Sequence, residues 1–131
     1  MEYCIMYDVR IINNQAILFK DNNQVANLRK EGGIIRYEFD DGSYVRIFGD
    51  NTIMWFDFDG NIHRNDGDMP AYIKTNGYMS YCKHGKGHRE NGPALIWPSG
   101  RAEYYLDGIN YHANQYVNEL NSSYGCILCM M

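Results

Sequence analysis

Residues 59–83 read DGNIHRNDGDMPAYIKTNGYMSYCK and residues 84–106 read HGKGHRENGPALIWPSGRAEYYL, so two consecutive segments have closely similar sequences. Their glycines keep a constant step, because Gly77→Gly100 and Gly85→Gly108 both span 23 residues. The step from His63 to His88 spans 25 residues, since the first segment has two extra residues in its 65–69 turn. The other matched positions are His63-Arg64 with His88-Arg89, Pro70-Ala71 with Pro93-Ala94, Ile73 with Ile96, and Tyr81 with Tyr104.

A repeat of this length indicates stacked supersecondary units, each of which buries its apolar face against the next one. A residue that recurs in every unit is typical of a structural role in every unit. The repeat therefore favours a scaffold over a single catalytic site, and we expect neither enzyme activity nor a cofactor.

The turns of the chain are regularly spaced. Gly, Asn and Asp recur every eight to twelve residues, with short β-rich runs between them, which is typical of an all-β meander. Asp41-Gly42, Asn76-Gly77 and Asp107-Gly108 supply the positive φ angles that tight hairpins need. We therefore expect an all-β fold, an antiparallel meander of hairpins. The predicted strands are Tyr3–Tyr7, Ala16–Lys20, Gln24–Leu28, Ile34–Phe39, Tyr44–Phe48, Thr52–Phe58, Ala71–Thr75, Tyr78–Lys83, Ala94–Trp97 and Arg101–Leu106.

An aromatic row is predicted to form the core. Alternation along the strands places Met79 and Tyr81 over Ala102 and Tyr104. Aligning each copy on its closing glycine adds Phe56, so we expect Phe56, Tyr81 and Tyr104 to lie in one buried row.

The whole chain, 1–131, is expected to form a single domain. Residues 1–32 have no repeat marks and are predicted to be N-terminal strands. Residues 33–112 carry the hairpin repeats, which are clearest at 59–107. Residues 113–131 form a short capping helix over Ala113–Leu120 followed by an apolar tail, because Tyr116, Val117 and Leu120 have helical spacing.

Composition excludes several classes of function. Twelve basic and sixteen acidic residues, without a face-sized basic cluster, argue against a duplex nucleic-acid reader. No signal peptide and no bilayer-length apolar run are recognised, so a membrane role is not expected. The four scattered cysteines do not indicate a disulfide framework, and we expect an intracellular setting, either the cytoplasm of a host or a virion.

Residues 85–108, GKGHRENGPALIWPSGRAEYYLDG, resemble the MORN repeat family in a diverged form. That form has an HR-x-x-GPA core and is common in proteins of giant DNA viruses and large phages. The 23-residue step matches the MORN length, and residues 84–87 are similar to its HGKG segment. The resemblance covers roughly 55–112, and the first unit departs from the pattern at 67–71. It implies an elongated, twisted antiparallel sheet used for binding or assembly, mostly with proteins and in some members with membranes or phosphoinositides.

The leading hypothesis is a non-enzymatic protein-interaction module of viral or phage origin, either a virion component or an effector that binds a host protein. Sheet-face aromatics, the repeated arginines or an exposed edge strand would make the contact. Open sheet edges also make a homo-oligomer plausible. The alternative hypothesis is a small-ligand binder that holds an anionic nucleotide or lipid headgroup against Arg64, Arg89 and the nearby histidines.

We interpret the His-Arg pairs as structural residues in preference to catalytic or ligand-binding ones. A histidine that opens each repeat can hydrogen-bond the turn backbone and pack on the aromatic row, while the arginine pairs with an acidic neighbour such as Glu90 or Asp66. No serine, cysteine or carboxylate recurs beside the pairs as a catalytic partner.

Two strings have the residue types of a zinc site. Cys82, His84 and His88 form C-x-H-x3-H, and Cys126 and Cys129 form CxxC. A lone CxxC is a weak signal and the repeat already accounts for His88, so we expect no metal site. The acidic groups Asp40-Asp41, Asp57/Asp59 and Asp66/Asp68 are interpreted as turn residues.

Aromatic side chains are the main candidates for a binding face. Tyr44, Tyr72, Tyr78, Trp97 and Tyr105 lie off the predicted core row, and rings with arginines are typical of interfaces. The other interpretation, held open, is that both faces of the sheet are covered and these rings are core.

Overall fold

The computed structural model describes residues 5–28, 33–64 and 67–124. It confirms an all-β fold with one short helix at its C-terminal end. The strands are β1 (Tyr7–Ile12), β2 (Gln15–Lys20), β3 (Asn23–Leu28), β4 (Ile35–Glu38), β5 (Tyr44–Ile47), β6 (Ile53–Phe56), β7 (Tyr72–Ile73), β8 (Met79–Ser80), β9 (Cys82–Lys83), β10 (Lys86–Gly87), β11 (Leu95–Ile96), β12 (Ala102–Leu106) and β13 (Ile109–Tyr111). Helix α1 (Ala113–Glu119) continues into a π-helical turn, η1 (Leu120–Tyr124).

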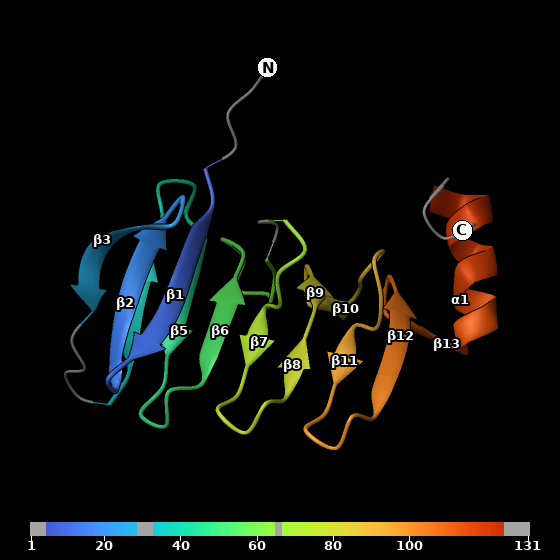
Figure 1. The fold of residues 1–131 in the computed structure, drawn as a ribbon. Helices are drawn as coiled ribbons and strands as arrows, with labels where there is room; N and C mark the ends of the chain where they lie inside the picture. Colours follow the sequence, from blue (N-terminus) through green and yellow to red (C-terminus); the bar gives the residue numbers. More distant parts are fainter. Residues whose placement is uncertain (1–4, 29–32, 65–66, 125–131) are drawn as a thin grey trace.

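Most of the strands form one large antiparallel sheet in the order β13-β12-β11-β8-β7-β6-β5-β4. Strands β1, β2 and β3 form a second sheet that lies against the β4–β6 end of the large one, and β9 and β10 form a separate hairpin (Figure 1). Within the large sheet, strands that follow one another in the chain lie side by side, and the β9–β10 hairpin leaves the sheet between β8 and β11. The large sheet is therefore a meander, as the turn spacing predicts.

The main core lies between the two sheets. In the large sheet, the side chains of Val45, Ile47, Ile53 and Trp55 alternate with outward-pointing residues and face the smaller sheet. We call this the inner face and the opposite side the outer face. Leu18 is fully buried at the contact. The buried members of this core are Val9, Ala16, Leu18, Val45, Ile47, Ile53, Trp55 and Ala71.

A second, smaller core lies at the other end of the large sheet, where α1 packs on β12 (Figure 1). Tyr116 and Leu120 on the helical segment are buried against Leu106. Their spacing of four residues puts both on one helical face, which is the pattern that predicts this helix. Among the described residues, no helix has the length and apolar character needed to span a membrane.

Tyr116 also bonds the loop of the second repeat. Its hydroxyl donates to the carbonyl oxygen of Arg89 at 2.5 Å and accepts from the Gly92 N–H at 3.1 Å. Tyr116→Phe removes both bonds and keeps the ring, so we expect it to lower the free energy of unfolding by about 1–2 kcal/mol in urea denaturation. The control is Tyr104→Phe, whose ring packs on Tyr116 at 4.8 Å but whose hydroxyl has no hydrogen bond within the described residues. Equal losses in both variants would contradict this role of the Tyr116 hydroxyl.

The two repeats share their backbone hydrogen bonds. The Trp55 N–H donates to the Ala71 carbonyl at 2.8 Å, and the Tyr81 N–H donates to the Ala94 carbonyl at 2.7 Å. Trp55, and not Phe56, is therefore the counterpart of Tyr81, and the predicted row of Phe56, Tyr81 and Tyr104 is wrong at its first position. The turn from Trp55 to Gly60 spans five residues, whereas Tyr81→Gly85 and Tyr104→Gly108 span four, so an alignment on the closing glycines shifts this strand by one residue.

The predicted row of Met79 and Tyr81 over Ala102 and Tyr104 is interrupted by another strand. The predicted strand Tyr78–Lys83 divides into β8 and β9, and β8 pairs with β11. Met79 and Ala102 both lie opposite Ile96, on either side of it, so they share a face but are separated by a strand. The short β11 follows Pro93-Ala94, and sequence alternation cannot show which strand lies between two others.

The first predicted strand differs as well. Tyr3–Tyr7 was expected, and β1 instead runs over Tyr7–Ile12, with residues 1–4 outside the described part of the chain. Asn13 and Asn14 have φ angles of 51° and 59° and form the hairpin turn to β2. Asparagine tolerates this conformation better than most residues, and an Asn-Asn turn gives a weaker signal than Asn-Gly.

Candidate functional site

The histidines of the two His-Arg pairs bond the turn backbone, which confirms their predicted structural role. The Nδ1 atom of His63 accepts from the His84 N–H at 2.9 Å, and the Nδ1 atom of His88 accepts from the Asp107 N–H at 2.9 Å. His84 and Asp107 have φ angles of 50° and 49°, so each histidine holds the same left-handed turn in its own repeat.

The arginines are bonded to protein acceptors. Arg64 donates to the carbonyls of Pro70 and Tyr7, contacts the Asp8 carboxylate at 3.2 Å, and stacks at 4.0 Å on Trp55, with its side chain 1% exposed. It thereby joins the repeat loop to β1. The predicted acidic partner Asp66 lies outside the described residues. The alternative hypothesis needs an accessible guanidinium group here, and this one is enclosed.

Arg89 repeats the arrangement one unit along. It donates to the carbonyl of Pro93, stacks at 3.8 Å on Tyr81, and forms two hydrogen bonds with Asp68 at 2.9 and 2.8 Å. These bonds lower the pKa of Asp68 and raise that of Arg89. The expected partner Glu90 is instead 2.9 Å from the Nε2 atom of His88. Asp68 therefore holds the guanidinium edge that an anionic ligand would need.

Three of the predicted binding rings form one cluster on the outer face. Tyr72 and Tyr78 meet edge to face with ring centroids 5.7 Å apart, and Tyr78 meets Trp97 in the same way at 5.5 Å. All three are half-buried. They line a groove of about 380 Å³ together with Lys74, Asn76 and Pro98. We call Tyr72, Tyr78 and Trp97 the aromatic cluster.

The two remaining rings lie elsewhere on the same face. Tyr44 stacks on Phe56 at 4.9 Å and has Arg36 at 3.9 Å over its ring, so it is buried although it points outward. Tyr105 is half-buried against Gly87, where an added Cβ would meet its ring at 3.2 Å. Tyr44 and Tyr105 therefore have packing roles, and the accessible aromatic surface is centred on the aromatic cluster.

Several basic side chains lie on the outer face. Arg36 and Arg46 project from β4 and β5 together with Glu38, while Lys74 and Arg101 lie one residue outside β7 and β12, near Asp50 and Glu103. Within the described residues, Arg36, Arg46 and Lys74 form no salt bridge and instead lie over aromatic rings. Arg36 and Lys74 are exposed and Arg46 is half-buried, so a partner can reach the first two charges. The charged residues of this face are Arg36, Arg46, Lys74, Arg101, Glu38 and Glu103.

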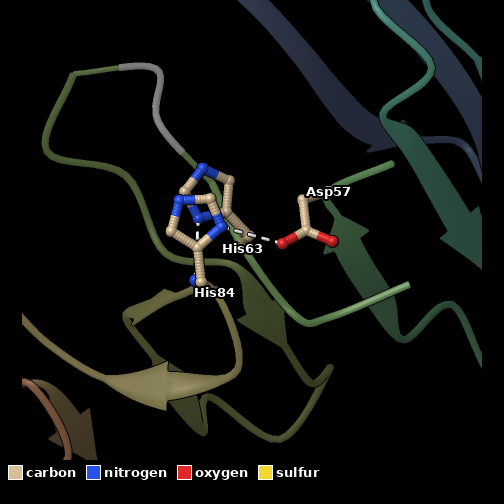
Figure 2. A group of neighbouring side chains, drawn as sticks. All are labelled: Asp57, His63 and His84. Atoms are coloured by element: carbon tan, nitrogen blue, oxygen red, sulfur yellow. Dashed lines mark hydrogen bonds and ion pairs between the residues drawn. The ribbon is translucent and has the colours of Figure 1, made fainter. Parts of the chain in front are cut away.

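A pocket that the sequence analysis does not identify lies beside the first repeat. Its volume is about 400 Å³, and it lies where the loops after β6 and β9 meet the β1 end of the smaller sheet. Asp57, His63 and His84 line this pocket, and Figure 2 shows their side chains close to one another. The apolar wall includes Phe39, Trp55 and Phe58, and Phe58 is an exposed aromatic side chain at its rim.

Asp57 anchors this group. Its Oδ1 atom accepts from the backbone N–H groups of Asp59 and Asn61 at 3.0 and 2.9 Å, which confirms its predicted turn role. Its Oδ2 atom is 2.9 Å from the Nδ1 atom of His84. Burial opposes ionisation of this carboxyl, but the hydrogen bonds outweigh burial and hold its pKa below the usual value. Burial and the neighbouring His84 lower the pKa of His63, so its ring is neutral at pH 7.

The predicted C-x-H-x3-H string does not come together. His84 faces Asp57, whereas His88 faces Glu90 and Asp107. The Cys82 sulfur lies 3.7 Å from the Ser80 hydroxyl, and burial raises the pKa of its thiol. Cys126 and Cys129 lie outside the described residues. Asp57 and His63 are six residues apart and His84 is a further 21 away, so no local motif relates the three.

Comparison with known proteins gives no relative: no family model, no curated protein and no solved structure matches the chain significantly. The resemblance to MORN repeats therefore rests on the sequence motif alone.

Proposed function

We propose that this protein is a non-enzymatic interaction module whose outer face binds an acidic region of a protein partner. The observation that carries the proposal is the aromatic cluster with two cations beside it, Lys74, which forms no salt bridge within the described residues, and Arg101, which is 3.5 Å from the Glu103 carboxylate. Lys74 lies 5.8 and 6.0 Å from the rings of Tyr72 and Tyr78, and Arg101 lies 4.9 Å from the ring of Trp97. Aromatic and basic side chains on one surface are typical of the residues that dominate binding energy at interfaces.

The shape of the surface supports a macromolecular partner. The groove at the aromatic cluster is shallow and open, and it lies on the sheet face that β1–β3 leave uncovered. A flat sheet face with half-buried rings suits an extended or flat protein surface, whereas small molecules favour enclosed pockets. The basic side chains of Lys74 and Arg101 beside the cluster favour carboxylates in the partner, and binding should weaken as salt screens these charges.

The test compares two charge reversals of equal size. Lys74→Glu/Arg101→Glu changes the outer face, and Lys83→Glu/Lys86→Glu changes exposed lysines around the β9–β10 hairpin. Tagged wild-type protein and both variants are used as bait in a lysate of infected or candidate host cells, and the recovered partner is then titrated directly. We expect the Lys74/Arg101 variant to lose a stoichiometric partner that the Lys83/Lys86 variant retains.

A third bait, Trp97→Ala, separates aromatic contact from charge, and thermal unfolding of all variants shows whether each is folded. A partner that is lost equally with both charge reversals, or retained by the folded Trp97→Ala and Lys74→Glu/Arg101→Glu variants, contradicts the proposal. Capture of virion proteins would identify an assembly component, and capture of a host protein would identify an effector.

A further inference from the structure

We propose that Asp57, His63 and His84 form a binding site for a divalent transition-metal ion such as zinc. One potential ligand atom from each of the three side chains lies within 4.8 Å of the other two (Figure 2). Two imidazole nitrogens and a carboxylate oxygen are the ligand types of open zinc sites, in which water or a substrate completes the coordination. This site lies apart from the outer face and does not depend on the function proposed for that face.

The repeat explains only part of this group. His63 has a counterpart in His88, so its bond to the following turn is structural in both units. The position of His84 is taken in the second unit by Asp107, and counting from the matched Trp55 and Tyr81 puts Lys83 in place of Asp57. The pairing of Asp57 with His84 is therefore particular to the first unit and is not required to build the repeat.

The spacing of two of the ligand atoms is close to that found around a bound zinc ion. The 2.9 Å between Asp57 Oδ2 and His84 Nδ1 is near the separation of about 3.3 Å between two ligands at the edge of a tetrahedral zinc site. Zinc would take the place of the proton between these two atoms, and in a neutral His84 that proton would move to Nε2, so that the ring binds as a neutral imidazole. The two N–H groups on Asp57 Oδ1 hold the carboxylate in place, as hydrogen bonds to metal-binding carboxylates commonly do.

At least one histidine ring must rotate for all three ligands to bind. Their rings are stacked, with centroids 4.0 Å apart and planes at 19°, and a metal must lie close to the plane of each ring. The side chain of His84 is 62% exposed, so it can turn at low cost. His63 would bind through Nδ1, exchanging its hydrogen bond from the His84 N–H for the metal, and its Nε2 would keep the proton.

The surroundings favour a cation. Asp40 and Asp41 line the same pocket and add negative charge opposite the three ligands. Hydrogen bonds from Ser43 keep the pKa of Asp41 low, so it is ionised at neutral pH. Arg64 also lines the pocket, but its charge is balanced by Asp8. The open positions of the metal would face this pocket, where a small anion or water has access.

The experiment titrates zinc into chelator-stripped, tag-free protein by calorimetry and repeats the titration with cobalt, whose visible spectrum reports the ligand set. Asp57→Asn and His84→Gln are compared with His88→Gln, which removes the matched histidine of the second unit. Loss of a supporting hydrogen bond alone typically weakens a metal site by 10–100-fold, so loss of a ligand should weaken zinc binding by more than about 100-fold. We expect that loss in the first two variants, with His88→Gln unchanged.

Cys126→Ser/Cys129→Ser tests whether the CxxC pair binds the metal instead, and circular dichroism shows whether each variant is folded. One-to-one binding that survives the cysteine substitutions and is lost in folded His84→Gln supports the site. Absence of saturable binding to wild-type protein, retention of full affinity by His84→Gln, or loss of binding in the cysteine variant alone would overturn it.

Discussion

Arg64→Ala is expected to lower the free energy of unfolding by about 3–5 kcal/mol. The guanidinium is enclosed between the repeat sheet and β1, and its removal leaves the carbonyls of Tyr7 and Pro70 and the carboxylate of Asp8 without this donor. A buried acceptor that loses its charged donor has no hydrogen bond to offset the free energy of removing it from water. Urea denaturation followed by tryptophan fluorescence measures the loss, because Trp55 lies directly beneath Arg64.

Arg89→Ala is the matched control for this change, since Arg89 makes the equivalent bond to a proline carbonyl and the equivalent ring contact one repeat later, but has no bond to β1. Its side chain is 16% exposed and its partner Asp68 is 36% exposed, so solvent can replace part of what is lost. We expect a loss of no more than about 1–2 kcal/mol. Equal losses for Arg64→Ala and Arg89→Ala would show that joining the two sheets adds nothing to the role of Arg64.

Leu18→Ala is expected to lower the free energy of unfolding by about 2–5 kcal/mol, because it opens a cavity at the centre of the inter-sheet core. Leu18 has 0% exposure and packs in the same cluster as Val45, Ile47 and Trp55. The variant should still unfold in one transition, since β1–β3 and the repeat sheet share this core. Two separate transitions in calorimetry would instead show that the smaller sheet folds independently.

Val25→Ala on β3 provides the control. Its side chain is 51% exposed, so we expect the free energy of unfolding to change by no more than about 0.5 kcal/mol. A loss in Val25→Ala as large as that in Leu18→Ala would mean that β3 depends on strand propensity more than on burial.

Local chemistry made several features predictable. Gly77 and Gly100 have φ angles of 102° and 91° and close matching hairpins, as their 23-residue step indicates. The spacing of Tyr116 and Leu120 predicts the C-terminal helix, and the recurrence of His63 and His88 predicts their bonds to the turns. In each case the residues that give the sequence pattern and the structural feature that they predict lie within a few residues of each other, or within one repeat.

The pairing of strands across the sheet was harder to predict from the sequence. Sequence alternation places Glu103 and Tyr105 on a common face, but it does not show that β11 separates β8 from β12. One extra residue in the turn between Trp55 and Gly60 hides the match of Trp55 with Tyr81. Hydrogen-bond partners in a sheet depend on the register, and one added turn residue changes the register that an alignment on the glycines implies.

The sequence by itself determined that this is an all-β repeat protein with a helical cap, because turn residues and periodicity act over short distances. Only the tertiary structure decided how its polar groups are used. Enclosure between two sheets makes Arg64 a structural residue, and the return of the chain at His84 brings that side chain to Asp57. The packing position of β1–β3 decides which face of the large sheet stays exposed and which charges lie on it. That position depends on the burial of apolar side chains from distant parts of the chain.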